Sequence, residues 1–208
     1  MAVTAEQVLT ALKELKDPSS GRTMSELGYL KHPELLDGGG VRVRVELPTP
    51  ASPWKQRIEE SVRAALASLK LPRVEVAFTA NVRPSPGKQN NPNDLVPSVK
   101  NVVLVGSGKG GVGKSTVSAN VACALANLGC KVGLLDADIY GPSMPLMMGL
   151  FGARPTSADG KSVNPLEAFG VKVISIGFFV DPDQAMIWRG PMLHGALVQL
   201  LRDVRWGD

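Results

Sequence analysis

The sequence lacks any hydrophobic run long enough to cross a lipid bilayer. Its longest apolar stretch, Ile174 to Val180, is far shorter than the about 20 residues that a membrane-spanning helix needs. The first residues, Met1 to Glu6, also lack the cationic start and apolar centre of a secretory signal peptide. We therefore expect a cytoplasmic protein that does not engage a membrane.

Cysteine and histidine are scarce, with only two of each in 208 residues. Cys123 and Cys130 do not have the spacing of a metal-binding pair, and thiols of this kind usually serve as packing residues. His32 and His194 are isolated from other candidate ligands in the sequence, so structural or surface roles are expected for both. Neither residue type predicts a metal centre.

Clusters of one charge are also missing. The chain has 23 Lys and Arg against 19 Asp and Glu, a net charge of +4, but the basic residues are scattered among acidic ones. This pattern favours a mixed, solvated surface, and we expect no nucleic-acid partner. A hydrophobic content of 44% is ordinary for a globular protein, and the length suffices for one or two domains, each with its own core.

What the chain does contain is a glycine-rich segment, GKGGVGKST, at Gly108 to Thr116, directly behind the apolar run Val102 to Val105. This is the G-x-x-x-x-G-K-[ST] pattern of a phosphate-binding loop. Its glycines let the backbone approach an anion, Lys114 supplies charge to the β- and γ-phosphates, and Ser115 offers a hydroxyl to Mg²⁺. The helix that begins there adds its positive end. The predicted nucleotide-binding residues are Gly108, Lys109, Gly110, Gly111, Val112, Gly113, Lys114, Ser115 and Thr116.

From Asn101 onward strand and helix patterns alternate, which predicts an α/β fold, a parallel sheet with helices on both faces. The expected strands are Val102 to Val105, Lys131 to Leu135 and Val171 to Ile176. The helix after the glycine loop shows apolar residues at helical spacing, namely Val117, Val121, Leu125 and Leu128.

The second strand ends in Asp136 and Asp138. Carboxylates at i and i+2 point the same way, toward the place where Mg²⁺ and the γ-phosphate would bind. Two interpretations stay open. The pair serves the nucleotide, or Asp136 caps the next turn while Asp138 is merely solvated.

Residues 1–80 are expected to form a small α+β domain, with a capping box at Thr4 and Gln7. The predicted order is helix, two strands, helix, strand, with a helix ending at Asp17 and Pro18, then Ser25 to Lys31, Val41 to Leu47, Trp54 to Lys70 and Val74 to Phe78. Residues 81–100 contain four prolines and no periodic apolar face, so they are predicted to be an extended linker. Residues 101–208 form the second domain.

A second lysine, Lys109, makes this loop similar to the deviant phosphate loop of ParA/MinD ATPases, where it reaches across a dimer to the partner's nucleotide. The longer stretch VGSGKGGVGKSTVSANVACALANLGCKVGLLDADIYGPSMPLMMG, with WRGPM at Trp188 to Met192, resembles the Mrp/ApbC family of iron-sulfur cluster carriers. Residues 1–80 resemble the iron-sulfur-assembly domain at the N-terminus of many such proteins. The resemblance implies a SIMIBI-class P-loop ATPase that uses ATP and Mg²⁺, forms a homodimer across the nucleotide and transfers clusters to apoproteins.

The resemblance also implies residue roles. Lys109, Lys114 and Asp138 would be catalytic, while Ser115 would bind Mg²⁺ directly and Asp136 through water. Asp181 follows an apolar run, as the metal-binding Asp of a second nucleotide-binding motif does. We nevertheless assign Asp181 to a loop. A stripe of methionines, Met144, Met147 and Met148, is interpreted as core or dimer packing.

Two departures from the family pattern are visible. A cluster needs about four thiolates, which the resembled carriers supply from a C-x-x-C pair per subunit in a region that would lie beyond Asp208. This chain therefore holds no iron-sulfur ligands, and Ser52 stands where some relatives have a cysteine. The chain also stops before a D-x-P-P-G-T-G-D segment, so a truncated copy with impaired hydrolysis is expected. A ParA/MinD-type positioning ATPase and a non-hydrolysing nucleotide-binding scaffold remain alternatives.

Overall fold

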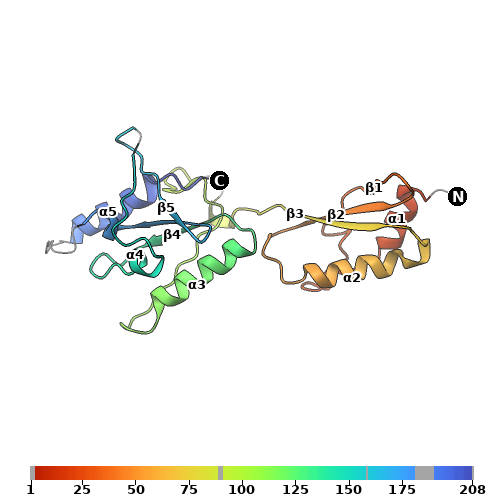
Figure 1. Cartoon of the computed structure of the whole chain (residues 1–208), viewed down its shortest axis with the longest axis horizontal. Helices are drawn as coiled ribbons and strands as arrows, with labels where there is room; N and C mark the ends of the chain where they lie inside the picture. The colour runs from red at the N-terminus through yellow and green to blue at the C-terminus, as the bar shows by residue number, and fades with distance from the viewer. Residues whose placement is uncertain (1–2, 89–90, 158, 181–189, 208) are drawn as a thin grey trace. The chain divides into compact units, whose positions relative to one another are not determined.

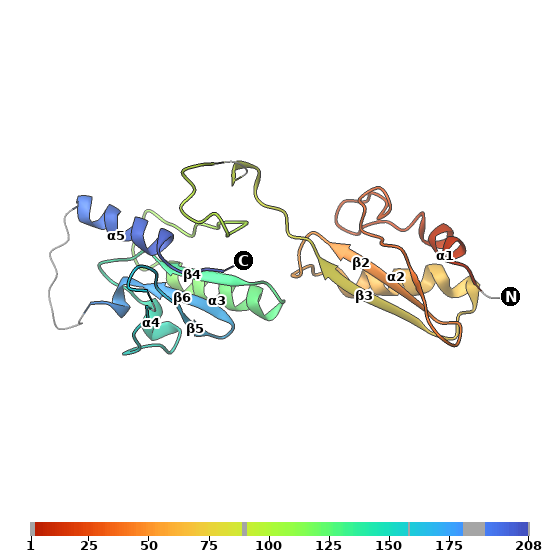
Figure 2. The same ribbon diagram turned by 90° about the horizontal axis from the view of Figure 1, so that it is seen from above.

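The computed structural model describes residues 3–88, 91–157, 159–180 and 190–207. Contacts divide the chain into two compact units, Met1–Arg83 and Pro84–Asp208 (Figures 1 and 2). In the described part of the chain, no helix is both long and apolar enough to cross a membrane.

The first unit is built on a three-stranded sheet in the order β1-β2-β3. β1 is antiparallel to β2, and β3 is parallel to β2. The helix α2 lies along β3 (Figure 1). Its elements are α1 (Ala5–Leu12), β1 (Glu34–Leu35), β2 (Val41–Leu47), α2 (Lys55–Leu66), η1 (Ala67–Leu69) and β3 (Val74–Ala80).

Buried apolar and more exposed polar residues alternate along β2, so one face of this strand forms part of the core. Val41, Val43, Val45 and Leu47 are buried, while the arginine side chains between them lie on the other face, where Arg42 Nε donates to Glu75 Oε2 at 2.8 Å. The predicted half-buried strand is therefore confirmed. The capping box is confirmed too, because Thr4 and Gln7 bond each other's backbone amides at the start of α1.

One predicted strand of the first unit is wrong. Ser25 to Lys31 forms a turn instead, in which Gly28 has a φ of +69° and its amide donates to Ser25 O at 3.1 Å. A positive φ interrupts an extended run, so only an isolated bridge between Leu30 and Val45 remains. The strand that completes the predicted order is the short β1.

Residues 1–83 are expected to fold without the rest of the chain, because they have their own sheet and their own core cluster. A fragment with these residues should give a dispersed amide NMR spectrum and one cooperative thermal transition. Its control is the same fragment with Met24→Asp, since Met24 is fully buried and an unpaired buried charge should abolish the fold. A collapsed spectrum from the unaltered fragment would show that the boundary is wrong.

The segment that follows is not extended throughout. Ser85 N donates to Lys100 O at 3.0 Å, and Ser85 Oγ donates to Asn101 Oδ1 at 2.7 Å, so the ends of this loop meet. Between them, η2 (Pro86–Lys88) brings Lys88 Nζ to 3.1 Å from Asp94 Oδ2 and 2.7 Å from Val96 O. The amide of Val96, together with Lys88, holds the pKa of Asp94 below its usual value. The prolines predicted an extended linker, but they could not predict that its ends meet or that a short 3-10 helix lies between them.

The second unit contains a three-stranded sheet in the order β4-β6-β5. β4 and β6 are parallel, as predicted, but β5 is antiparallel to β6, so the sheet is mixed rather than wholly parallel. Phe169 and Gly170 join β5 to β6 with φ values of +52° and +73°, which are those of a tight type I′ hairpin. The elements are α3 (Lys114–Asn127), β4 (Val132–Asp136), α4 (Met144–Met147), β5 (Leu166–Ala168), β6 (Val171–Ser175), η3 (Ile176–Phe178) and α5 (Gly190–Arg202).

The predicted strand Val102 to Val105 is not formed. These residues have no regular secondary structure, and their side chains are exposed, with Val103 at 75% and Leu104 at 91%. A strand exists only when a neighbouring strand takes up its backbone hydrogen bonds. None of the strands in the described residues pairs with this segment.

The spacing of the large apolar residues of α3 predicts that they form its buried face, but a different face of the helix is buried. Val117, Val121 and Leu128 are between 43% and 51% exposed, whereas Ala119 and Ala122 are buried in the core. Small residues let the helix approach β4 and β6 closely. Figures 1 and 2 show α3 against one face of this sheet.

Trp206, from the C-terminal part of the described chain, packs against the middle of β4. A Cβ built at Gly133 would lie only 2.5 Å from Cε3 of Trp206, so glycine is required for the indole to lie there. Trp206 is fixed by its Nε1, which donates to Leu201 O at 2.9 Å, and by its carbonyl, which accepts from Lys172 Nζ at 2.8 Å.

Candidate functional site

The glycine loop leads into α3 with backbone torsions that few other residues adopt. Gly111 and Gly113 have φ values of +72° and +89°, and Gly113 is the N-cap of the helix without any side-chain cap. A Cβ built at any of the four loop glycines would meet no atom within 4 Å. These glycines are therefore not required by packing. The open space beside the backbone and the uncapped helix end suit a bound anion.

Local hydrogen bonds shape the loop around this space. Ser107 Oγ donates to Lys109 O at 2.7 Å, and Val117 N donates to Gly113 O at 2.9 Å. Lys114 and Ser115 are half-buried at the helix start. The other predicted nucleotide-binding residues, Gly108, Lys109, Gly110, Gly111, Val112 and Thr116, are exposed, and Gly113 is half-buried.

Chain connectivity places this loop at the same end of the unit as the aspartate pair. α3 spans 14 residues and β4 spans five, or about 21 Å and about 17 Å. Only residues 128–131 separate them, so the chain reverses direction, and α3 packs against both β4 and α4. The start of α3 therefore lies near the end of β4, where Asp136 and Asp138 stand.

Asp136 is the more buried of the two carboxylates, with 3% of its surface exposed. Its Oδ1 accepts from Asp138 N at 3.1 Å. Its Oδ2 accepts from Met144 N at 3.1 Å and from Ser175 Oγ at 3.2 Å. Asp136 thus holds the following loop and the first residue of α4, as the capping interpretation proposed.

Asp138, in contrast, is exposed. Its Oδ1 accepts from Gly141 N at 3.0 Å, which closes the turn after the strand. The carboxylate is therefore oriented by its own loop while it stays accessible to a ligand.

The donor set at this end fits Mg²⁺. A serine hydroxyl and carboxylate oxygens are ligands that Mg²⁺ prefers. Asp136 Oδ1 keeps a free lone pair in its hydrogen-bond geometry, because only one donor reaches it among the described residues. Ser143, the N-cap of α4, has a buried Oγ without a hydrogen-bond partner in the described part of the chain, which is a place where an ordered water would be satisfied.

The remaining candidates do not gather into a site. In the described ranges, no group of three or more His, Cys, Asp or Glu could hold a metal ion. Cys123 packs against the core cluster, and His32 and His194 are exposed. The predicted loop residue Asp181 and the segment from Trp188 lie outside or at the edge of the described residues.

The methionine stripe divides between core and surface. Met144 and Met148 are buried, at 3% and 2% exposure, so core packing is confirmed for them. Met147 and its neighbour Leu146 are exposed.

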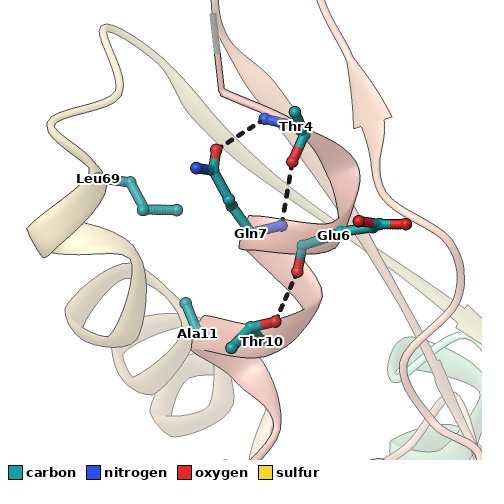
Figure 3. A pocket seen from close by; sticks show the side chains of 6 residues that line it. All are labelled: Thr4, Glu6, Gln7, Thr10, Ala11 and Leu69. Carbon is teal, nitrogen blue, oxygen red and sulfur yellow. Dashed lines mark hydrogen bonds between the residues drawn. The ribbon is translucent and has the colours of Figure 1, made fainter. Parts of the chain in front are cut away.

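A shallow, open hollow in the first unit offers little chemistry. It is lined by Thr4, residues of α1 and Leu69, and Figure 3 shows that Thr4, Gln7 and Thr10 form hydrogen bonds within this helical segment. Thr4 and Gln7 form the capping box, and Thr10 Oγ1 donates to Glu6 O at 2.8 Å. These groups have local structural roles.

Sequence reasoning missed Ser175 and Gly177, which contact the aspartate loop from β6 and η3. Ser175 is the first polar residue in the apolar run from Val173, but nothing in that pattern indicates its partner. For Gly177 there was a weaker signal, since a glycine within an apolar run marks close approach of another segment.

Comparisons with known proteins agree with both halves of the chain. Residues 98–208 match the family model of NUBPL iron-transfer P-loop NTPases, and residues 5–78 match that of iron-sulfur cluster assembly proteins. The chain is 44% identical over 210 residues to an iron-sulfur cluster carrier protein of Synechocystis, covering 99% of this chain and 58% of that protein.

A carrier protein of Deinococcus radiodurans is 45% identical over 204 residues, covering 98% of this chain and 56% of its own length. The chain therefore spans a little over half the length of these relatives. A solved structure of a nucleotide-binding protein from Archaeoglobus fulgidus, in complex with ADP, is 40% identical. It has a TM-score of 0.42 and covers 50% of this chain and 39% of that chain.

Proposed function

Because this chain belongs to the family of iron-transfer P-loop NTPases, we propose that it binds ATP with Mg²⁺ and serves in ATP-dependent transfer of iron-sulfur clusters to apoproteins. The observation that carries this proposal is the open glycine loop at the start of α3. It lies at the same end of the unit as Asp136 and Asp138, and its glycines are not needed for packing.

The roles of the loop residues follow from charge and position. Lys114, the first residue of α3, would contact the β- and γ-phosphates, and Ser115 would ligate Mg²⁺. When bound, Mg²⁺ supplies neutralising charge to the phosphate oxygens. Asp136 would hold a metal-bound water through Oδ1, and the exposed Asp138 would orient the attacking water.

Lys109 is proposed to act across a homodimer. It is exposed, and its carbonyl rather than its ammonium is used within the loop. An exposed lysine beside a phosphate site can reach the nucleotide of a second copy, where its charge would stabilise the transition state. ATP hydrolysis would then depend on dimer formation, with hydrolysis acting as a conformational gate for cluster transfer.

The iron-sulfur cluster would be the cargo of this protein. Among the described residues, Cys123 is engaged in core packing and is not grouped with other ligands. The cargo part of the proposal is supported by the names of the relatives and by the first unit, which matches the model of iron-sulfur cluster assembly proteins.

A gene replacement in the host cell tests the proposal. Removal of the gene should lower the activity of iron-sulfur enzymes while their protein levels stay constant. The unaltered gene should restore these activities, whereas Lys114→Ala should not, because the phosphate contact is lost. A zinc enzyme assayed in the same extracts is the control. Unchanged iron-sulfur enzymes together with misplaced plasmids or division sites would instead indicate a positioning ATPase.

A further inference from the structure

A serine hydroxyl behind the aspartate loop has a fixed direction. Ser175 is the last residue of β6 and is completely buried. Its Oγ accepts a hydrogen bond from Gly177 N at 3.1 Å and lies 3.2 Å from Asp136 Oδ2. An amide can only donate and a carboxylate can only accept, so the serine proton must point at Asp136.

This hydrogen bond helps to determine which oxygen of Asp136 remains available. Oδ2 accepts from Ser175 Oγ and from Met144 N, so both of its lone pairs are used. Oδ1 accepts only from Asp138 N among the described residues. The carboxylate is therefore held by three donors from three segments, and the lone pair left for a ligand is on Oδ1.

The segment that contains Ser175 also contacts the aspartate loop through Gly177. A Cβ built at Gly177 would lie 3.0 Å from Pro142 Cγ and 3.1 Å from Pro145 Cγ. Both prolines belong to the segment that starts at Asp136 and ends in α4. The end of β6 and η3 thus pack directly against the aspartate loop.

We propose that Ser175 is a positioning residue for the nucleotide-metal site, which acts by fixing the Asp136 carboxylate so that Oδ1 is the oxygen that would serve the metal. Gly177 assists by allowing Pro142 and Pro145 to pack against η3. The inference rests on the proposed nucleotide function. It adds that the metal affinity of the site depends on a strand that contributes no ligand.

Metal binding in the presence of ADP tests this role. Ser175→Ala removes one hydrogen bond and hardly changes the volume. Loss of a supporting hydrogen bond of this kind is expected to weaken the affinity for Mn²⁺, measured by EPR on the full chain with saturating ADP, by about 10-fold. The affinity for ADP in EDTA should stay within about twofold of the unaltered chain, because the glycine loop is untouched.

Val173→Ala is the matched control. Val173 is fully buried in the same strand, two residues before Ser175, so its truncation should lower the melting temperature without changing Mn²⁺ affinity. An Mn²⁺ affinity in Ser175→Ala equal to that of the unaltered chain would overturn the inference, and so would an equal loss in Val173→Ala.

A second variant keeps the test decisive if Ser175→Ala does not fold. Gly177→Ala retains the hydroxyl but presses on the two prolines, so Mn²⁺ affinity should again fall while ADP binding in EDTA persists. Unchanged Mn²⁺ affinity in this variant would overturn the inference. If the unaltered chain bound no ADP at all, the proposed function would fail first, and the inference with it.

Discussion

Lys114→Ala is expected to weaken ATP binding by about 10- to 150-fold, since a charge-assisted hydrogen bond to phosphate contributes about 1.5–3 kcal/mol and each 1.4 kcal/mol is a factor of about ten. Lys114 is the first residue of α3 and directly follows the open glycine loop. Its ammonium would therefore add to the field of the helix start at the same phosphates. Titration with a fluorescent ATP analogue on the purified chain measures the effect.

Lys109→Ala is the matched control for this prediction. Lys109 has the same charge and lies in the same loop, but it is exposed and is not required by the phosphate-loop pattern. Its removal should leave ATP affinity within about threefold and lower turnover instead, because its proposed role begins only in the dimer. Equal loss of affinity in both variants would refute the division of roles. Unchanged melting temperatures would show that neither variant is misfolded.

The second large effect concerns the exposed segment Val102 to Val105. Apolar side chains next to unpaired backbone groups invite pairing with another chain. Val103 and Leu104 are 75% and 91% exposed, so the purified chain is expected to self-associate at micromolar concentrations. Val103→Lys together with Leu104→Lys should shift it to a monomer, because two added charges oppose strand pairing. Sedimentation velocity over a concentration series measures this shift.

The control adds the same charge at a place with no unpaired backbone. Ala64→Lys with Ala67→Lys serves this purpose, because both alanines are exposed at the end of α2 and in η1. These substitutions should leave the association unchanged. A monomeric unaltered chain, or dissociation caused equally by both pairs, would contradict the prediction.

Features with local causes could be predicted from the sequence. The capping box at Thr4, the alternation of β2 and the start of α3 after Gly113 depend on torsions and periodicities within a few residues. The parallel pairing of β4 and β6 also follows from two apolar strands connected by a long crossover.

Features that depend on a distant partner could not be predicted. Val102 to Val105 has the composition of a strand, but composition does not supply a neighbour. In α3 both faces are apolar, one of alanines and one of larger residues, so periodicity indicated a helix without showing which face is buried. The hairpin at Phe169 could not be predicted, because phenylalanine rarely adopts the positive φ that this turn requires.

The candidate site also combines features that could be predicted from local sequence with one that depends on a distant residue. The glycine loop and the Asp136–Asp138 pair are motifs, and the order of the elements shows why they lie at one end of the unit. The hydrogen bond from Ser175 to Asp136 joins residues 39 positions apart in the chain. Only the register between β4 and β6, in which Asp136 is opposite Ser175, brings the two together.

The contact between Trp206 and Gly133 gives the second unit an optical property. An indole ring packed against a strand emits at shorter wavelength than one in water, and its emission changes when the strand moves. Gly133 is three residues before Asp136 on the same strand, so Trp206 is a fluorophore that contacts the strand ending at the candidate site. We therefore expect a movement of β4 on ligand binding to change the emission of Trp206, above a background from Trp54 and Trp188.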